Sequence, residues 1–262
     1  MALTVEVFQR NYQDLASLTA RKNTYPNNFA TGTSDNAGRV RGVEAAVDVA
    51  RRGGLALRAA YTLQESQSTV DAAALGNIFW LREANPFVPS FLSSNAPGQF
   101  AKATFDFRTG AGEGPRVFGH RPLGRSALVV FYDGRSGRPY SRLLDPYPID
   151  QGVRLSGLTG NVNGSRTPWT HRVDLYAERG FGVRSATLAA FVWAENVAGR
   201  RNVRAVYRAT GLPDDDGYLG TQAGRQERPE GSAANLFYRL RLADPANYGV
   251  ARQVRVGLKL TL

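Results

Sequence analysis

Two histidines and one run of aspartates are the residues whose types first suggest chemistry. His120 and His171 lie far apart, and neither stands at a spacing typical of metal ligands or of a catalytic triad. Asp214, Asp215 and Asp216 supply the carboxylate oxygens that calcium prefers, but the full calcium-loop pattern with a distal glutamate is missing. We interpret this run as a solvated turn, with a calcium site as the weaker alternative.

Two further patterns argue against an enzyme. The chain has no cysteine, which excludes a thiol nucleophile, a disulfide framework and a thiolate metal site. The glycine-rich stretch 110–114 lacks the Lys-Ser/Thr pair and the helix of a phosphate-binding loop, so we interpret it as a turn. We therefore predict a protein that is not an enzyme and that uses neither a cofactor nor a metal.

The strongly basic composition narrows the class of partner. The formal net charge is +11 and the isoelectric point is near 10.3. The arginines alternate with apolar residues or cluster in loops, as Arg51 and Arg52 do, and they form no basic run interleaved with aromatics. Such arginines suit a polar lumen or lipid phosphates better than nucleic acid. We predict no nucleic-acid partner.

The elements that position these residues are predicted from alternation of apolar and polar side chains, which marks a strand with one face buried. No apolar run is long enough for a transmembrane helix. Strand lengths of about nine to thirteen residues match a tilted strand that crosses a bilayer. The pattern predicts eight strands, over 3–13, 42–50, 55–66, 99–108, 125–133, 170–179, 185–196 and 250–262.

The links between these strands alternate in length. Links on one side are predicted at 51–53, 109–124 and 180–182, of which 109–124 is longer than the pattern expects, and long links on the other side at 14–38, 67–97, 141–167 and 197–249. Outer-membrane barrels have short periplasmic turns and longer extracellular loops, so the long links are predicted to lie outside the cell.

The end of the sequence carries the most specific motif. Arg255, Gly257, Leu260 and Leu262 form a polar-x-Gly-x-x-apolar-x-apolar arrangement that is similar to the signal read by the barrel assembly machinery. Other stretches occur in an order that resembles the C-terminal barrel region of TonB-dependent receptors, in particular the Oar-like group: 38–44, 60–64, 136–140, 173–175, 194–197, 210–218 and 247–248.

This resemblance implies an all-β fold, an antiparallel up-and-down transmembrane β-barrel portion with about eight strands of a roughly 22-stranded barrel. Residues 1–262 would form the C-terminal part of the barrel, with plug domain and signal peptide absent. The implied function is active import of an unidentified nutrient across the cell outer membrane. The implied partners are outer-membrane lipid and lipopolysaccharide, the barrel assembly machinery, and the TonB complex through a plug domain that this sequence lacks.

Candidate ligand-binding residues follow from their predicted positions in loops. Aromatic residues near strand ends are interpreted mainly as a belt at the lipid interface, with stacking on a sugar as the alternative. The candidates for ligand contact are Trp80, Arg82, Tyr147, Trp169 and Tyr218. Two other functions remain open: a small self-contained eight-stranded outer-membrane barrel with a structural or adhesion role, and a basic soluble β-domain that binds polyanions.

Overall fold

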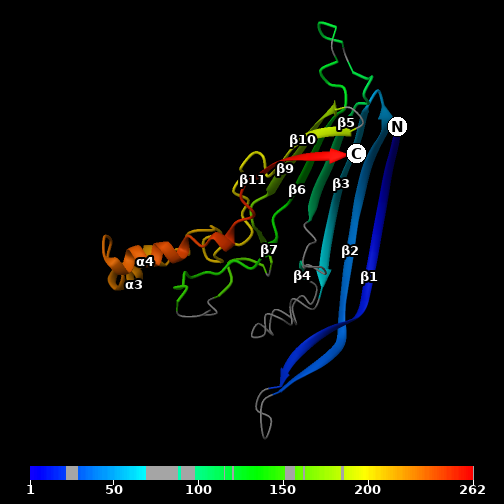
Figure 1. The fold of residues 1–262 in the computed structure, drawn as a ribbon. Coiled ribbons are helices and arrows are strands. Elements are labelled where there is room, and N and C mark those ends of the chain that lie inside the picture. The colour runs from blue at the N-terminus through cyan, green and yellow to red at the C-terminus, as the bar shows by residue number, and fades with distance from the viewer. Residues whose placement is uncertain are drawn as a thin grey trace.

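The computed structural model describes residues 1–21, 29–68, 88–89, 98–114, 116–119, 121–150, 157–161, 163–183 and 186–261. Its main element is an antiparallel sheet with the strand order β1-β2-β3-β5-β6-β9-β10-β11 (Figure 1). The strands are β1 (Ala2–Arg21), β2 (Phe29–Arg52), β3 (Leu55–Ser68), β5 (Gln99–Arg108), β6 (Ser126–Arg135), β9 (Thr170–Val183), β10 (Ala186–Glu195) and β11 (Gln253–Thr261). Short β4 (Val88–Pro89) pairs with β3, and β7 (Pro139–Tyr140) pairs with β8 (Ser165–Arg166).

Each of the eight predicted strands corresponds to one of these long strands. Two predicted links need correction. The link 14–38 is largely strand, because β1 and β2 continue as a two-stranded ribbon that pairs as far as Arg21 with Phe29. Its sequence lacks clean alternation, and bulges near Leu15 shift the register. The predicted turn 180–182 lies inside β9, and the chain reverses after Val183.

The strand order places successive links at alternate ends of the sheet, as predicted, but their lengths do not alternate strictly, because the β5–β6 link spans 109–125. The connections β2–β3, β5–β6 and β9–β10 lie at one end of the sheet, here called the turn end. The connections β1–β2, β3–β5, β6–β9 and β10–β11 lie at the opposite end, here called the loop end. Gly53 and Gly54 form a two-residue turn, with φ of 59° and 87°, and Arg52 pairs with Leu55 across it. Two successive left-handed residues match the twist of a hairpin, which explains the glycine pair.

The two faces of the sheet differ sharply in polarity. The register aligns one row of apolar residues across seven strands, from β2 to β11: Val49, Leu57, Phe105, Val130, Leu175, Ala194 and Val254. Rows above and below it on the same side, the apolar face, include Leu3, Val5, Val7, Val47, Ala59, Ala103, Tyr132, Val192 and Val256. The opposite side, the polar face, carries Asp48, Arg58, Lys102, Asp133, Arg172 and Asp174.

The apolar face has no protein layer over it in the described part of the chain. Val7 is 82% exposed, and Val256 on the other edge strand is 74% exposed. On β3 the apolar residues run from Leu55 to Leu63, a length of about 26 Å at about 3.3 Å per residue. Beyond that band the same face turns polar, with Arg41 paired to Glu65 at 2.6 Å.

The eight-stranded sheet is open in the described residues. β1 and β11 lie at the two ends of the strand order, and each pairs with one neighbour. The prediction of an antiparallel, mainly β protein is confirmed, while closure into a barrel stays a prediction.

Residues 197–249, here called the loop lobe, depart from the all-β expectation. They contain η1 (Tyr218–Gly220), α3 (Gln222–Glu227), α4 (Ala233–Leu242) and η2 (Pro245–Asn247), and they project from the loop end of the sheet (Figure 1). The side chains of Thr221 and Ser232 cap the first turns of α3 and α4. The lobe has its own small core of Tyr218, Tyr238 and Leu242.

Candidate functional site

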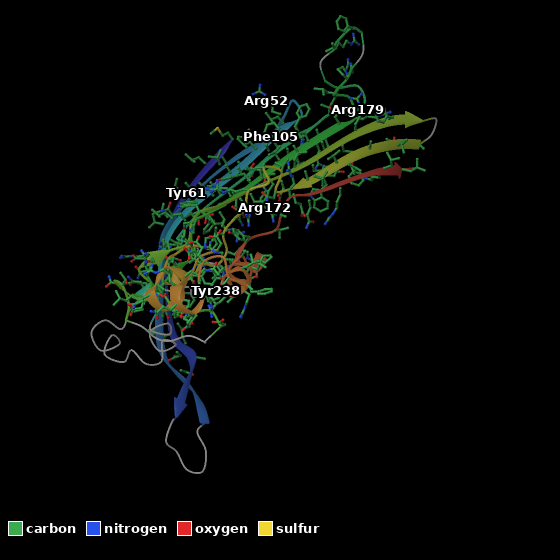
Figure 2. All side chains as sticks on the ribbon, turned by 90° about the vertical axis from the view of Figure 1, so that its left-hand side faces the viewer. Arg52, Tyr61, Phe105, Arg172, Arg179 and Tyr238 are labelled. Atoms are coloured by element: carbon green, nitrogen blue, oxygen red, sulfur yellow. The ribbon has the colours of Figure 1, made fainter. Side chains whose placement is uncertain are left out.

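A cavity of about 340 Å³ lies at the loop end of the sheet, where β6 and β9 meet the loop lobe. Two strands supply its floor from the polar face, the β7–β8 region supplies one wall, and the lobe supplies the other. The lining residues are Asp133, Arg135, Ser136, Arg138, Thr167, Thr170, His171, Arg172, Asn202, Val203, Arg204, Gly249 and Val250. Figure 2 labels Arg172 near the place where the sheet approaches the lobe.

The floor of the cavity is organised by ion pairs within single strands. Arg135 contacts Asp133 on β6 through two bonds, of 2.6 and 2.9 Å. Arg172 contacts Asp174 on β9 at 2.7 Å. Each pair joins residues two positions apart, so both members lie on the same face of a strand. The paired carboxylates hold these two guanidinium groups in place.

The β7–β8 wall depends on a very close backbone approach at Gly137. A Cβ atom at this position would lie 1.5 Å from the carbonyl oxygen of Thr167, which only glycine avoids. The backbone NH of Arg138 donates to the Thr167 hydroxyl at 2.9 Å, and the Thr167 NH donates to the Arg138 carbonyl at 2.9 Å. Arg138 is thereby fixed at the rim of the cavity.

The opposite wall is attached to β9 through Asn202. Its side-chain amide donates to the carbonyl oxygen of His171 at 2.7 Å, and its side-chain oxygen accepts from the His171 NH at 2.8 Å. The backbone carbonyl of Asn202 accepts from Gly249 at 2.7 Å, and the backbone NH of Arg204 donates to Asn247 at 2.8 Å. Arg204 therefore reaches the cavity from a segment held to the sheet.

Asn196 joins the two ends of the loop lobe. It is 1% exposed, and its side-chain amide donates to the carbonyl oxygens of Arg200 at 3.0 Å and of Val250 at 3.1 Å. Its side-chain oxygen accepts from the Arg200 NH at 3.2 Å, and its own NH donates to Asp174 at 2.9 Å. Asp174 thus connects this junction to Arg172 in the cavity floor.

Inside the lobe, a buried polar network surrounds Tyr238. Its hydroxyl donates to Asp216 and accepts from the Ile149 NH at 3.1 Å. The Arg228 guanidinium lies 4.0 Å from the centre of its ring and pairs with Asp150 at 2.8 Å. Burial, and then the hydrogen bond to Asp216, raise the pKa of Tyr238 above its usual value. This network shapes the lobe and lies apart from the cavity.

An aromatic group on the apolar face adjoins the cavity through His171, which is itself a lining residue. The ring of His171 stacks on Trp169 at 5.9 Å and on Tyr132 at 6.2 Å, and the Tyr132 hydroxyl contacts His171 Nδ1 at 2.8 Å. The alternation of side chains along β9 and the register place His171 on the same face as Val173 and Leu175. Trp193 instead lies on the polar face, opposite Arg255.

The predicted ligand residues do not come together in one place. Trp80, Arg82 and His120 lie outside the described residues. Tyr147 is half-buried and is not among the residues that line the cavity. Tyr218 is 6% exposed, and its hydroxyl donates to Glu227 at 2.7 Å, so its ring belongs to the lobe core.

Among the predicted ligand residues, Trp169 is nearest in sequence to a residue that lines the cavity. It is adjacent to Thr170 in the sequence and is 38% exposed. It does not itself line the cavity.

The three aspartates that were interpreted as a turn, with calcium as the weaker alternative, make separate contacts. Asp214 accepts from Tyr248 at 3.3 Å, Asp215 accepts from the Gly217 NH at 2.8 Å, and Asp216 accepts from the Tyr218 NH at 2.9 Å. In the described part of the chain, no group of three or more histidine or acidic side chains is arranged to hold a metal ion. These bonds fit the interpretation as a turn.

The residues of the predicted assembly signal lie on β11. The Arg255 guanidinium is 5.1 Å from the centre of the Trp193 ring on the polar face. Gly257 faces Phe191, whose ring fills the space that a side chain would take. Leu260 is 62% exposed on the apolar face, and Leu262 lies outside the described residues.

Comparison with protein-family models and with curated proteins gives no match for this chain. None of the described helices is both long and apolar enough to cross a membrane.

Sequence reasoning missed the cavity arginines as a group. The local signal was present, because Asp133 and Arg135, like Arg172 and Asp174, alternate on one face of a strand. No local pattern indicates that Arg138 and Arg204 approach one cavity from two different connections.

Proposed function

We propose that this chain forms a membrane-spanning sheet of an outer-membrane β-barrel of the TonB-dependent receptor kind, and that its loop-end cavity helps to capture an imported ligand. The observation that carries the proposal is the continuous apolar face, whose side chains are exposed on the edge strands β1 and β11 and half-buried on β6. Every strand of the sheet contributes to that face, from Val7 on β1 to Val256 on β11.

The size of the apolar face supports a lipid environment. Eight strands about 4.8 Å apart, with a band about 25 Å high, present roughly 1,000 Å². The largest apolar patch on a typical soluble monomer is about 300–600 Å². A lipid-facing surface accounts for the excess, because hydrocarbon chains solvate apolar side chains without a further protein layer.

The polar face supports a water-filled interior on the other side. Asp48 pairs with Arg58 at 2.9 Å, and Asp106 pairs with Arg51 at 3.0 Å. Charged pairs of this kind suit a hydrated lumen and are costly in hydrocarbon. The open edges at β1 and β11 further support pairing with additional strands, because unpaired backbone groups are costly within a bilayer.

Refolding the purified chain with and without lipid tests this proposal. We expect β-sheet circular dichroism in bilayers or micelles and aggregation in buffer alone. A monodisperse, folded β protein in buffer without detergent would contradict the proposal. A compact band on an unheated gel that shifts on boiling would mean that eight strands close by themselves, which favours the self-contained small barrel.

A further inference from the structure

We propose that the loop-end cavity binds a multiply charged oxyanion, whose phosphoryl or carboxylate oxygens are held by Arg138 and Arg204. This inference rests on the proposed function, because it names the class of ligand that the barrel lumen would capture. Four arginines and one aspartate line the cavity. The lining therefore carries an excess of positive charge.

Two of the four arginines already have carboxylate partners. Arg135 is paired with Asp133 and Arg172 with Asp174, at 2.6 and 2.7 Å. These pairs form the floor of the cavity, and their charges are largely balanced within the protein. They contribute fixed NH donors more than net attraction.

Arg138 and Arg204 differ from these two arginines in their charge partners. In the described part of the chain, neither side chain has a carboxylate oxygen within the 4.0 Å of an ion pair. Both residues are exposed at the rim, and both have backbones fixed by hydrogen bonds, to Thr167 and to Asn247. A guanidinium group offers a planar fork of NH donors that matches the spacing of oxygens in a carboxylate or phosphate.

The position of these two arginines favours a ligand that bridges them. Arg138 belongs to the β7–β8 wall and Arg204 to the lobe wall, on opposite connections of the sheet. Ser136 and Thr170 also line the cavity, and the Ser136 hydroxyl accepts from the Gln99 NH at 2.9 Å. The volume of about 340 Å³ is at the small end of the range for small-molecule sites. A compact anion with oxygens on two sides fits this arrangement.

The test is a titration of the folded chain in detergent micelles, once with inorganic phosphate and once with citrate. Binding is measured by calorimetry and by tryptophan fluorescence. The variant R138Q/R204Q is compared with R52Q/R116Q, which removes the same charge from the exposed turn end. We expect R138Q/R204Q to bind at least about tenfold more weakly than the parent chain, with little change in the control. The tighter of the two anions tells whether phosphoryl or carboxylate groups are preferred.

Circular dichroism checks that each variant keeps its β-sheet. The variant R138K/R204K provides a second test of the two guanidinium groups. Because lysine keeps the charge but lacks the fork, we expect intermediate binding from this variant. The proposal is overturned if neither anion binds the folded parent chain, or if both glutamine variants lose binding equally. If the chain is soluble and folded without detergent and still binds the anion, the proposed oxyanion site stands and the proposed membrane function is wrong.

Discussion

The side chain of Asn202 forms two hydrogen bonds with the backbone of His171, one to its NH at 2.8 Å and one to its carbonyl oxygen at 2.7 Å. An asparagine thereby continues the pairing pattern of the sheet beside the first residues of β9. This contact attaches one wall of the cavity to its floor.

Replacing Asn202 with alanine should release that wall. We expect a loss of about 1–3 kcal/mol in local stability, because two backbone groups of His171 lose their partners. Hydrogen exchange of residues 200–204 measures the effect. Asn202→Asp retains the acceptor and loses the donor, so its exchange should be intermediate. Unchanged protection in Asn202→Ala would contradict this role.

Asn196 should contribute more than Asn202 to the stability of the loop lobe, because its single side chain joins both ends of the lobe. Its backbone has φ of 50°, a left-handed conformation that asparagine and glycine tolerate. Asn196→Gly keeps that conformation and removes the side-chain bonds to Arg200 and Val250. We expect it to lose about 2–3 kcal/mol, and Asn196→Ala to lose somewhat more through backbone strain.

Limited proteolysis of the loop lobe in the two Asn196 variants provides the measurement. Cleavage should be faster in both variants than in the parent chain, and fastest in Asn196→Ala. If Asn196→Gly resists protease as well as the parent chain does, the residue serves backbone conformation alone.

The Tyr238 network predicts a pH dependence in the lobe. Its folded-state pKa is raised, so the unfolded chain loses the phenolic proton first as the pH rises above about 10. The stabilisation is complete below that pH and is lost as the pH rises toward the folded-state pKa. Near-UV circular dichroism from about pH 9 to 12 should show the lobe melting.

Tyr238→Phe is the matched variant for this titration. It lacks the ionising group, so its lobe should be less stable at neutral pH, where Asp216 loses its hydrogen bond, and less sensitive to alkaline pH. If the lobe of the Tyr238→Phe variant melts over the same alkaline range as the parent, the transition belongs to another group.

At the edge of the sheet, Gly257 and Phe191 should be energetically coupled. A Cβ atom on residue 257 would lie 2.6 Å from the Phe191 ring, so Gly257→Val must displace the ring. We expect a cost of about 1–3 kcal/mol from overpacking. In the Phe191→Ala background the same substitution should cost less, and a double-mutant cycle in urea measures the difference. If the free-energy costs of the two substitutions simply add, Gly257 and the Phe191 ring are not energetically coupled.

The sequence allowed the sheet to be predicted better than the cavity, for a physical reason. Alternation is a local property, so Leu57 and Arg58 could be placed on opposite faces before any partner strand was known. The cavity depends on contacts between distant connections, such as Arg138 on one wall and Arg204 on the other. The helices of the lobe were missed because the stretch was interpreted as one long loop, although Ser232 carries a local helix-capping signal.

The proposal that one face meets lipid while the other meets water is tested most directly at two adjacent residues of β3. Ala56 lies on the polar face opposite Asp106, and Leu57 lies on the apolar face opposite Phe105, which is labelled in Figure 2. Because the chain has no cysteine, Ala56→Cys and Leu57→Cys each give one site for an environment-sensitive fluorophore. The labelled proteins are reconstituted in bilayers that contain lipids with quenching groups on their acyl chains. We expect strong acyl-chain quenching at residue 57 and quenching by aqueous iodide at residue 56. Equal quenching at both positions by either agent would contradict the assignment of the two faces.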